Sequence, residues 1–412
     1  MNALKAAGVA VITLALASVN GSDFLYRIFY TLLVVFLVCL VWSTASIFRF
    51  RITREPTSLR AQVGQVLEER LSIANTGFWP KLWLEVRDHS NLPDYNPSRV
   101  VSLGPLASAS WLAGVRCRRR GEYHLGPVAV STGDPFGLFR WTRFVTPTFR
   151  LLVYPATIAL PQFDLSRGDL SGGSSQSYGP HQPTARAASV RDYVPGDPLS
   201  HVHWPSTARA RRFIVKEFEL DPTSDVWLLL DLQAEAQRGR GEESTEEYGV
   251  AVAASLAKRL LEVDRAVGLA INDRAPVCVA IDRGPRQLVR VLECLAVVRA
   301  DGSRRFAEFL LAESFRLSRN TTAIVITPSE DESWVEALKL ATRRGAQAIV
   351  VFLEPRSFEG IEGGSDMASA LVASGVPVYL VKQGASLAEA LAMPIGAAAA
   401  PIVPLNGPAM KP

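Results

Sequence analysis

The sequence predicts a multidomain protein, in which an N-terminal transmembrane helical hairpin precedes a β-sandwich-like module and an α/β domain with an open sheet. Three observations predict this order: two apolar stretches within the first 50 residues, period-two alternation after them, and a later alternation of strand-like and helical patterns. The 412 residues have room for two or three domains of about 150 residues each. We expect a hairpin at 1–50, a β-rich module at 51–160, a linker loop with a motif segment at 161–221, an α/β domain at 222–392 and a disordered tail at 393–412.

Charge and composition exclude several classes of protein. Lys and Arg number 44 against 40 Asp and Glu, and a net charge of +4 supplies no broad field for binding nucleic acid. A hydrophobic content of 48% with 20% charged residues excludes a disordered chain. The four cysteines lie too far apart for a paired zinc spacing or a disulfide framework, so we expect reduced thiols in a protein that faces the cytosol.

The two N-terminal apolar stretches cover residues 6–19 and 29–47. The second has 19 uncharged residues, and at 1.5 Å per residue it can roughly span a hydrocarbon core of about 30 Å. The first is either the other half of a hairpin or a signal peptide. Arg49, Arg51 and Arg54 follow the second stretch, and cationic residues beside a span stay on the cytoplasmic side. Both alternatives predict an inner (plasma) membrane protein, multi-pass if the hairpin is kept, with the bulk of the chain in the cytoplasm.

The module after the apolar segments alternates apolar and polar residues in short runs such as QVLEERLSIAN and KLWLEVRD, with turn residues between them. Period two with turns predicts antiparallel strands. The pattern continues to LLVYP at residue 155, so a β-sandwich or small barrel of about 90 to 110 residues fits this region.

A motif-rich segment, residues 190–219, follows a loop rich in Gly, Ser and Pro. Asp197 and Pro198 have the residue types of a helix cap and first helical position, so a short helix is expected to begin at Asp197 and to be broken at Pro205. The run RRFIVKEFE alternates as a strand. The candidate recognition or structural residues are Arg191, Tyr193, Gly196, Asp197, His201, His203, Trp204 and Arg209.

The spacing of these residues resembles a family signature. Arg191-x-Tyr193-x-x-Gly196-Asp197, followed by Trp204 and Ala208-Arg209, is similar to the motif of the domain-of-unknown-function-58 family of bacterial membrane-anchored proteins. The upstream run RRGEYHLGPVAVSTGDPFGLF and the order of the domains extend the resemblance over nearly the whole chain. The resemblance implies a von Willebrand factor A-like C-terminal domain. It also implies a MoxR-type AAA+ ATPase or a transglutaminase-like membrane protein as a partner, and it brings no established enzyme activity.

The C-terminal region has the pattern of a doubly wound, Rossmann-type sheet. Its strand-like runs are VWLLLDL, VGLAIND, PVCVAID, TAIVITP, QAIVVFLE and VPVYLVK, and its helical patterns lie at 246–263, 285–298, 304–315, 332–344 and 366–373. Only Arg274 and Ala275 separate the second and third runs, which predicts an antiparallel hairpin there. Ligands of such sheets bind beyond the carboxyl ends of the strands.

The loop after the first of these strands is a degenerate metal site by comparison with the resembled fold. Metal-binding von Willebrand factor A-like domains carry Asp-x-Ser-x-Ser here, whereas this chain has Asp231, Gln233 and Glu235 at those positions, so both hydroxyl groups are gone. Gln and Glu oxygens can still coordinate Mg²⁺. We expect an acidic rim that has lost its metal, and therefore no cofactor.

Two functions remain open. The first is a membrane-anchored cytoplasmic scaffold or adaptor without enzyme activity, in which Asp197 and Arg209 shape the motif segment while His201 and His203 face a protein partner. The alternative is a hydrolase that uses the His and Asp residues of segment 191–209. No Gly-x-Ser-x-Gly elbow occurs, and two histidines two residues apart lack the spacing of zinc ligands on a helix.

Overall fold

The computed structural model describes residues 2–145, 148–163, 165, 187–193, 202–210, 212–218, 225–274, 277–318, 321–343, 345–361 and 366–395. The chain divides into two compact units: residues 1–156 together with 295–297, and the remainder. Three of the motif residues, Gly196, Asp197 and His201, lie outside the described residues, as does the tail from residue 396.

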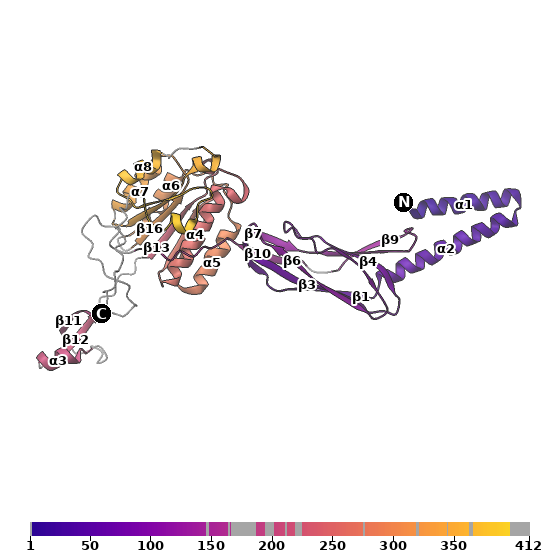
Figure 1. Cartoon of the computed structure of the whole chain (residues 1–412), viewed down its shortest axis with the longest axis horizontal. Coiled ribbons are helices and arrows are strands. Elements are labelled where there is room, and N and C mark those ends of the chain that lie inside the picture. Colours follow the sequence, from indigo (N-terminus) through magenta and orange to yellow (C-terminus); the bar gives the residue numbers. More distant parts are fainter. Residues whose placement is uncertain are drawn as a thin grey trace, which may run out of the picture. The chain divides into compact units, whose positions relative to one another are not determined.

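Two apolar helices open the first unit, α1 (Asn2–Asn20) and α2 (Asp23–Ile47), drawn in indigo in Figure 1. Gly21 connects them in the left-handed region, with a φ of 62° that glycine adopts without steric cost. The mean hydropathy of their apolar windows is 1.7 and 2.4, and most of their side chains are exposed. Both helices are long and apolar enough to cross a membrane, as the two apolar stretches predict.

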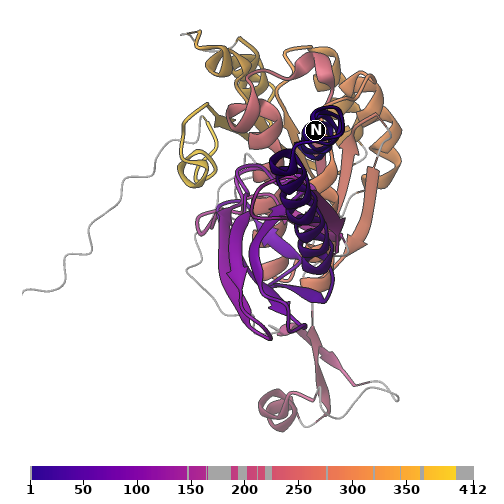
Figure 2. The same ribbon diagram turned by 90° about the vertical axis from the view of Figure 1, so that its right-hand side faces the viewer.

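The β-rich module of the first unit consists of short antiparallel sheets, with β2 and β10 as a parallel pair. Its strands are β1 (Phe50–Pro56), β2 (Arg60–Gln62), β3 (Val66–Asn75), β4 (Lys81–Asp88), β5 (Arg99–Leu103), β6 (Ser108–Arg116), β7 (Gly121–Leu125), β8 (Val128–Gly133), β9 (Arg140–Phe144) and β10 (Phe149–Tyr154). They form sheets of order β1-β3-β6, β2-β10-β7 and β5-β4-β8-β9. Side chains of β3 pack against β4 and β8 in one apolar cluster and against β7 and β10 in another. The strand-rich prediction is thus confirmed as a set of packed sheets (Figure 2).

A buried ionic network joins two of these sheets. The guanidinium of Arg54 on β1 donates to both carboxylate oxygens of Glu69 on β3, at 2.7 and 2.8 Å, and to Asp88 on β4, at 3.2 and 3.1 Å. All three side chains are almost fully buried. Burial raises the pKa of Glu69, and Arg54 opposes that rise. Truncating one member would leave the others as uncompensated buried charges, so the network fixes how the sheets pair.

The second unit contains a six-stranded, mostly parallel sheet of order β15-β14-β13-β16-β17-β18. Its strands are β13 (Asp225–Asp231), β14 (Val267–Asn272), β15 (Val277–Asp282), β16 (Thr321–Thr327), β17 (Gln347–Leu353) and β18 (Val378–Val381). Its longer helices are α4 (Thr245–Glu262), α5 (Gly284–Val297), α6 (Phe306–Glu313), α7 (Ser333–Arg343) and α8 (Asp366–Ala373), each within two residues of its predicted ends. Shorter elements are η2 (Ala234–Ala236), η3 (Gly241–Glu243), η4 (Ser314–Arg316), η5 (Pro355–Glu359) and α9 (Leu387–Ala390). β15 pairs antiparallel with β14, which confirms the predicted hairpin.

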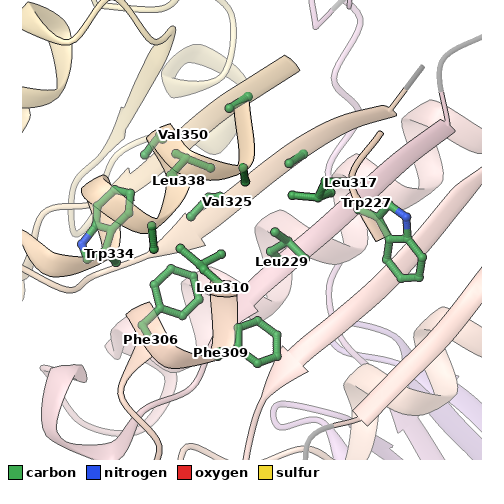
Figure 3. Close-up of a cluster of buried hydrophobic side chains, with 14 of the residues drawn as sticks. Trp227, Leu229, Phe306, Phe309, Leu310, Leu317, Val325, Trp334, Leu338 and Val350 are labelled. Carbon is green, nitrogen blue, oxygen red and sulfur yellow. The ribbon is translucent and has the colours of Figure 1, made fainter. Parts of the chain in front are cut away.

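A large apolar core covers one face of this sheet. Trp227 and Leu229 of β13 and Val325 of β16 pack against Phe309 of α6 and Trp334 of α7 (Figure 3). The indole N–H of Trp334 donates to the carbonyl of Ser329 at 3.1 Å, so this buried ring has no unsatisfied donor. Packing of this kind holds the carboxyl ends of the strands in fixed positions.

The motif segment forms a hairpin, in which β11 (Ala187–Asp192) pairs antiparallel with β12 (Ile214–Phe218) and the helix α3 (Trp204–Ala210) lies in the connection (Figure 2). We call the described residues 187–193, 202–210 and 212–218 the motif hairpin. The prediction that Pro205 breaks the helix is wrong, because α3 begins at Trp204 and contains Pro205 in its first turn. A proline is tolerated there because the first N–H groups of a helix have no intrahelical acceptor.

Candidate functional site

The predicted metal-loop carboxylate, Asp231, is the last residue of β13 and is 1% exposed. Its Oδ1 accepts hydrogen bonds from the backbone N–H of Gln233 at 3.0 Å and from the side-chain amide of Asn272 at 3.3 Å. Its Oδ2 accepts from the hydroxyl of Thr327 at 2.7 Å. Because Asn272 ends β14 and Thr327 ends β16, this carboxylate ties the carboxyl ends of three adjacent strands together.

The environment of Asp231 favours its neutral form. Burial raises the pKa of Asp231 to about 6, and the hydrogen bonds from Thr327, Gln233 and Asn272 oppose that rise. The side chain of Asn272 also donates to the carbonyl of Arg304 at 3.0 Å, so the network continues into the segment before α6. The cluster is a closed polar network in which each carboxylate oxygen has a donor from the chain itself.

The other two predicted ligand positions do not converge on Asp231. The side-chain oxygen of Gln233 accepts from the backbone N–H of Phe306 at 3.2 Å, at the start of α6. Glu235 lies exposed in η2. Asp331, the acid after β16, accepts from Ser333 at 3.0 and 2.7 Å at the start of α7, and these hydrogen bonds lower its pKa. Within the described residues no group of three or more His, Cys, Asp or Glu side chains is placed to hold a metal.

This geometry predicts that divalent cations leave the stability of the protein unchanged. A ligand raises the melting temperature only by binding the native state, and the oxygens of Asp231 are occupied by the chain's own donors. Thermal unfolding of the full chain in detergent micelles, with and without millimolar Mg²⁺ or Mn²⁺, measures this directly. A metal-dependent rise in melting temperature that disappears in Asp231→Ala would show that the loop binds a cation.

The motif hairpin presents aromatic side chains at its surface. The ring of Phe213 lies 5.9 Å from that of Tyr193 and 6.5 Å from that of Trp204, in tilted and edge-on geometries. Trp204 is 62% exposed and Phe213 is 52% exposed. Arg209 and Arg212 are also exposed. Exposed aromatic residues beside arginines are the composition of protein-binding hot spots.

His203 serves the local geometry of this hairpin. Its backbone N–H donates to the carbonyl of Ile214 at 2.7 Å, and its ring Nδ1 lies 2.7 Å from the hydroxyl of Ser206. Thr207 accepts from the backbone N–H of Ile214 at 3.1 Å, which holds α3 against β12. His203 is half-buried. Arg191 lies in β11 opposite Val215.

Residues 189–359, which include the motif hairpin and strands β13 to β17, match the model of the family described as "Protein of unknown function DUF58". The "Uncharacterized protein YeaD" of Bacillus subtilis (strain 168) is 27% identical over 268 residues. That match covers 64% of each protein, so the chain spans somewhat less than two thirds of this relative's length. The match of residues 189–359 to the DUF58 family agrees with the family resemblance that the motif spacing predicts.

Solved structures match only part of the chain. The CARDB domain of the PF1109 protein from Pyrococcus furiosus is 19% identical, covering 26% of this chain and 96% of that domain, with a TM-score of 0.20. A β-glucosidase from Listeria innocua is 12% identical, covering 25% of this chain and 16% of the enzyme, with a TM-score of 0.17. Scores this low support no inference about fold or function.

Proposed function

We propose that the chain is a membrane-anchored cytoplasmic scaffold or adaptor that binds a protein partner through its motif hairpin and α/β domain. The observation that carries the proposal is the exposed aromatic pair Trp204 and Phe213, in the segment that carries the DUF58 signature. Aromatic rings that a soluble surface leaves in water gain free energy when a partner covers them. The Asp231 cluster, in contrast, is closed and offers no reactive group to a substrate.

The α/β domain has features of a von Willebrand factor A-like domain, and we propose that it is one. Numbered along the chain, its strands have the order 3-2-1-4-5-6 of an open doubly wound sheet, and the third is antiparallel. A carboxylate, Asp231, ends the first strand, and a threonine, Thr327, ends the fourth. In this proposal the domain keeps the framework of a metal-dependent binding site and replaces the metal by hydrogen bonds.

The partner that the family resemblance implies is a MoxR-type AAA+ ATPase, with a transglutaminase-like membrane protein as a second candidate. The chemistry of the motif hairpin requires a partner surface with an apolar pocket for Trp204 and acidic side chains near Arg209. No cofactor and no nucleic acid enter this proposal.

Removing the aromatic pair should abolish partner binding without unfolding the hairpin. We expect Trp204→Ala with Phe213→Ala to weaken binding of the detergent-solubilised full chain to an immobilised MoxR-type ATPase from the same organism by about 10-fold or more. Phe144→Ala, which removes an exposed aromatic ring of the β-rich module, outside both the motif hairpin and the α/β domain, is the matched control and should bind normally. Unchanged affinity in the double variant would show that the hairpin is not the binding surface.

One observation favours the hydrolase alternative, namely the 2.7 Å contact between His203 and Ser206. These residues flank the first turn of a seven-residue helix, and no described carboxylate orients the imidazole, so the contact has the form of a local helix cap. An enzyme would lose turnover in His203→Ala while keeping its fold. An adaptor would show no turnover in either form.

The proposed location is the inner (plasma) membrane, with both apolar helices as spans and the bulk of the chain in the cytoplasm. Arg49, Arg51 and Arg54 directly after α2 support this orientation. We expect a green fluorescent reporter fused after residue 412 to fluoresce and an alkaline phosphatase fused there to be inactive. An active phosphatase at that position would reverse the topology.

A further inference from the structure

The turn between β8 and β9, residues 134–139, lies beside the apolar helix α2 (Figure 1). The ring of Phe139 packs on Phe36 with 5.1 Å between the centroids. The indole N–H of Trp141 donates to the hydroxyl of Ser43 at 3.2 Å. The Cys39 thiol donates to Asp134 between these two contacts. The β8–β9 turn therefore follows one face of α2 for two helical turns.

The position of these contacts along α2 gives the depth of the turn. A hydrocarbon core needs about 20 helical residues, and 20 residues counted from Phe24 reach Ser43. Phe36 lies seven residues before Ser43, which is roughly 10 Å at 1.5 Å per residue. The β8–β9 turn thus reaches below the level at which the bilayer surface is expected.

The side chains of the turn suit that depth. Phe136, at its apex, is 71% exposed, and Pro135 beside it is exposed. The backbone N–H groups of the turn need no water, because the carboxylate of Asp134 accepts from the N–H groups of Phe136 at 2.9 Å, Leu138 at 3.2 Å and Phe139 at 2.5 Å. Satisfying these donors within the protein removes one of the main costs of placing a loop in lipid.

Asp134 itself is shielded from lipid. The residue is 7% exposed. Burial raises the pKa of Asp134, but hydrogen bonds from the N–H groups of Phe139, Leu138 and Phe136 lower it by more than burial raises it. The pKa of this carboxyl therefore lies below its ordinary value. The charge is held inside the turn by three donors and is not presented at the apex.

Other exposed apolar residues lie near the end of α2. Phe48, Phe78, Trp79 and Leu106 are exposed, and the ring of Trp79 lies 5.1 Å from that of Trp42 on α2. The backbone N–H of Leu106 donates to the carbonyl of Gly77 at 3.2 Å, which brings two of the loops together. Aromatic residues at this level match the interfacial belt of membrane proteins. Exposed Arg140 and Arg143 on β9 follow the turn, as expected for contact with anionic headgroups.

We infer that the β8–β9 turn inserts into the cytoplasmic leaflet beside α2, so that the β-rich module has a second contact with the lipid bilayer. The inference rests on the proposed membrane anchoring, because the depth of the turn is measured along α2. The occupant of this apolar surface is lipid. The turn is continuous with the face of a helix long enough to span, and its backbone donors are satisfied without water.

The test is a depth measurement on the full chain reconstituted in phosphatidylcholine and phosphatidylglycerol vesicles. A nitroxide is attached to Phe136→Cys in a background that carries Cys278→Ser and Cys294→Ser, since the remaining Cys39 and Cys117 are buried. Power-saturation spectroscopy compares relaxation by oxygen, which concentrates in lipid, with relaxation by a water-soluble nickel chelate. Val34→Cys on the exposed face of α2 is the lipid control, and Leu112→Cys on β6 is the aqueous control.

We expect oxygen to dominate at positions 34 and 136 and the nickel chelate to dominate at position 112. If the nickel chelate relaxed the nitroxide more than oxygen did at position 136, but oxygen relaxed it more at position 34, the insertion of the turn would be wrong and the membrane anchoring would stand. If the nickel chelate also relaxed the nitroxide more than oxygen did at position 34, both the membrane anchoring and the inference that depends on it would be wrong.

Discussion

Replacing Asp231 by alanine destabilises the α/β domain by about 3 kcal/mol or more, because it leaves three buried donors without an acceptor. These donors are the backbone N–H of Gln233, the amide of Asn272 and the hydroxyl of Thr327. Hydrogen exchange of the full chain in micelles, read on peptides from β13 and β16, should show faster exchange in the variant. Glu235→Ala in the same loop is the control, since Glu235 is exposed and should leave exchange unchanged. Equal protection in both variants would mean that the cluster does not hold the strands.

The conservative variant Asp231→Asn isolates the titration of this carboxyl. Its folded-state pKa is raised from 3.8 to about 6, so the native state binds more protons than the unfolded chain between these values. The associated stability is fully present below pH 4 and is lost as the pH rises through 6. At 1.36 kcal/mol per unit, the free energy of unfolding of the wild type relative to Asp231→Asn should fall by about 3 kcal/mol from pH 4 to pH 7.

The informative quantity is the difference in free energy of unfolding between the wild type and Asp231→Asn. Burial and the neighbouring Asp301 also raise the pKa of Asp273 to about 6, but that contribution is common to both proteins and cancels. A difference that does not change with pH would show that Asp231 is ionised throughout.

Replacing Lys81 by methionine should separate α2 from the β-rich module. The ammonium group of this residue, which is 1% exposed, donates to the carbonyls of Ser46 at 2.8 Å and Phe48 at 2.7 Å, at the end of the helix. These are orphan carbonyls at the negative end of the helix dipole, and burial lowers the pKa of the lysine without removing its donors. Leaving both carbonyls unsatisfied costs about 2 to 5 kcal/mol.

The measurement is limited proteolysis of the micelle-bound chain, with cleavage expected after Arg49 or Arg51 in the Lys81→Met variant. Arg87→Met on the same strand removes an exposed cation and should leave the joint resistant. Resistance in Lys81→Met equal to that of the wild type would show that the aromatic contacts alone hold the helix.

The fold could be predicted from the sequence where the pattern is local. The apolar runs of the sheet and the five longer helices of the second unit follow from periodicity, and the two-residue gap at 275 predicts the antiparallel hairpin. The position of Asp231 at the end of a buried strand can also be predicted from the local sequence pattern. Its partners are not, because Asn272 and Thr327 lie 41 and 96 residues away and meet it only through the strand order.

Side-chain burial was harder to predict for the same reason. Alternation along β4 does not distinguish Lys81 from a solvated lysine, since its acceptors come from a helix end more than thirty residues earlier. The prediction of a break at Pro205 fails because a proline is compatible with both a helix break and the first turn of a helix. The exposure of Trp204 depends on which strand packs beneath α3, which periodicity does not reveal. One sequence signal could have pointed to Asn272 as a partner of Asp231: it is a polar residue at the end of a buried apolar run.

The way the chain enters and leaves the β-rich module determines how it carries mechanical load. β1 begins three residues after α2 ends and pairs with the end of β3 at Asn75. The exit strand β10 ends at Tyr154, whose carbonyl accepts from Val63, close to the opposite end of β3 at Val66. A pull on the chain beyond residue 156 therefore acts along the strands, and the ladder hydrogen bonds, which lie across that direction, are strained together in shear. If the proposed membrane anchoring holds, tension along the chain loads the β1–β3 and β10–β7 ladders in shear, which would make the module a stiff tether.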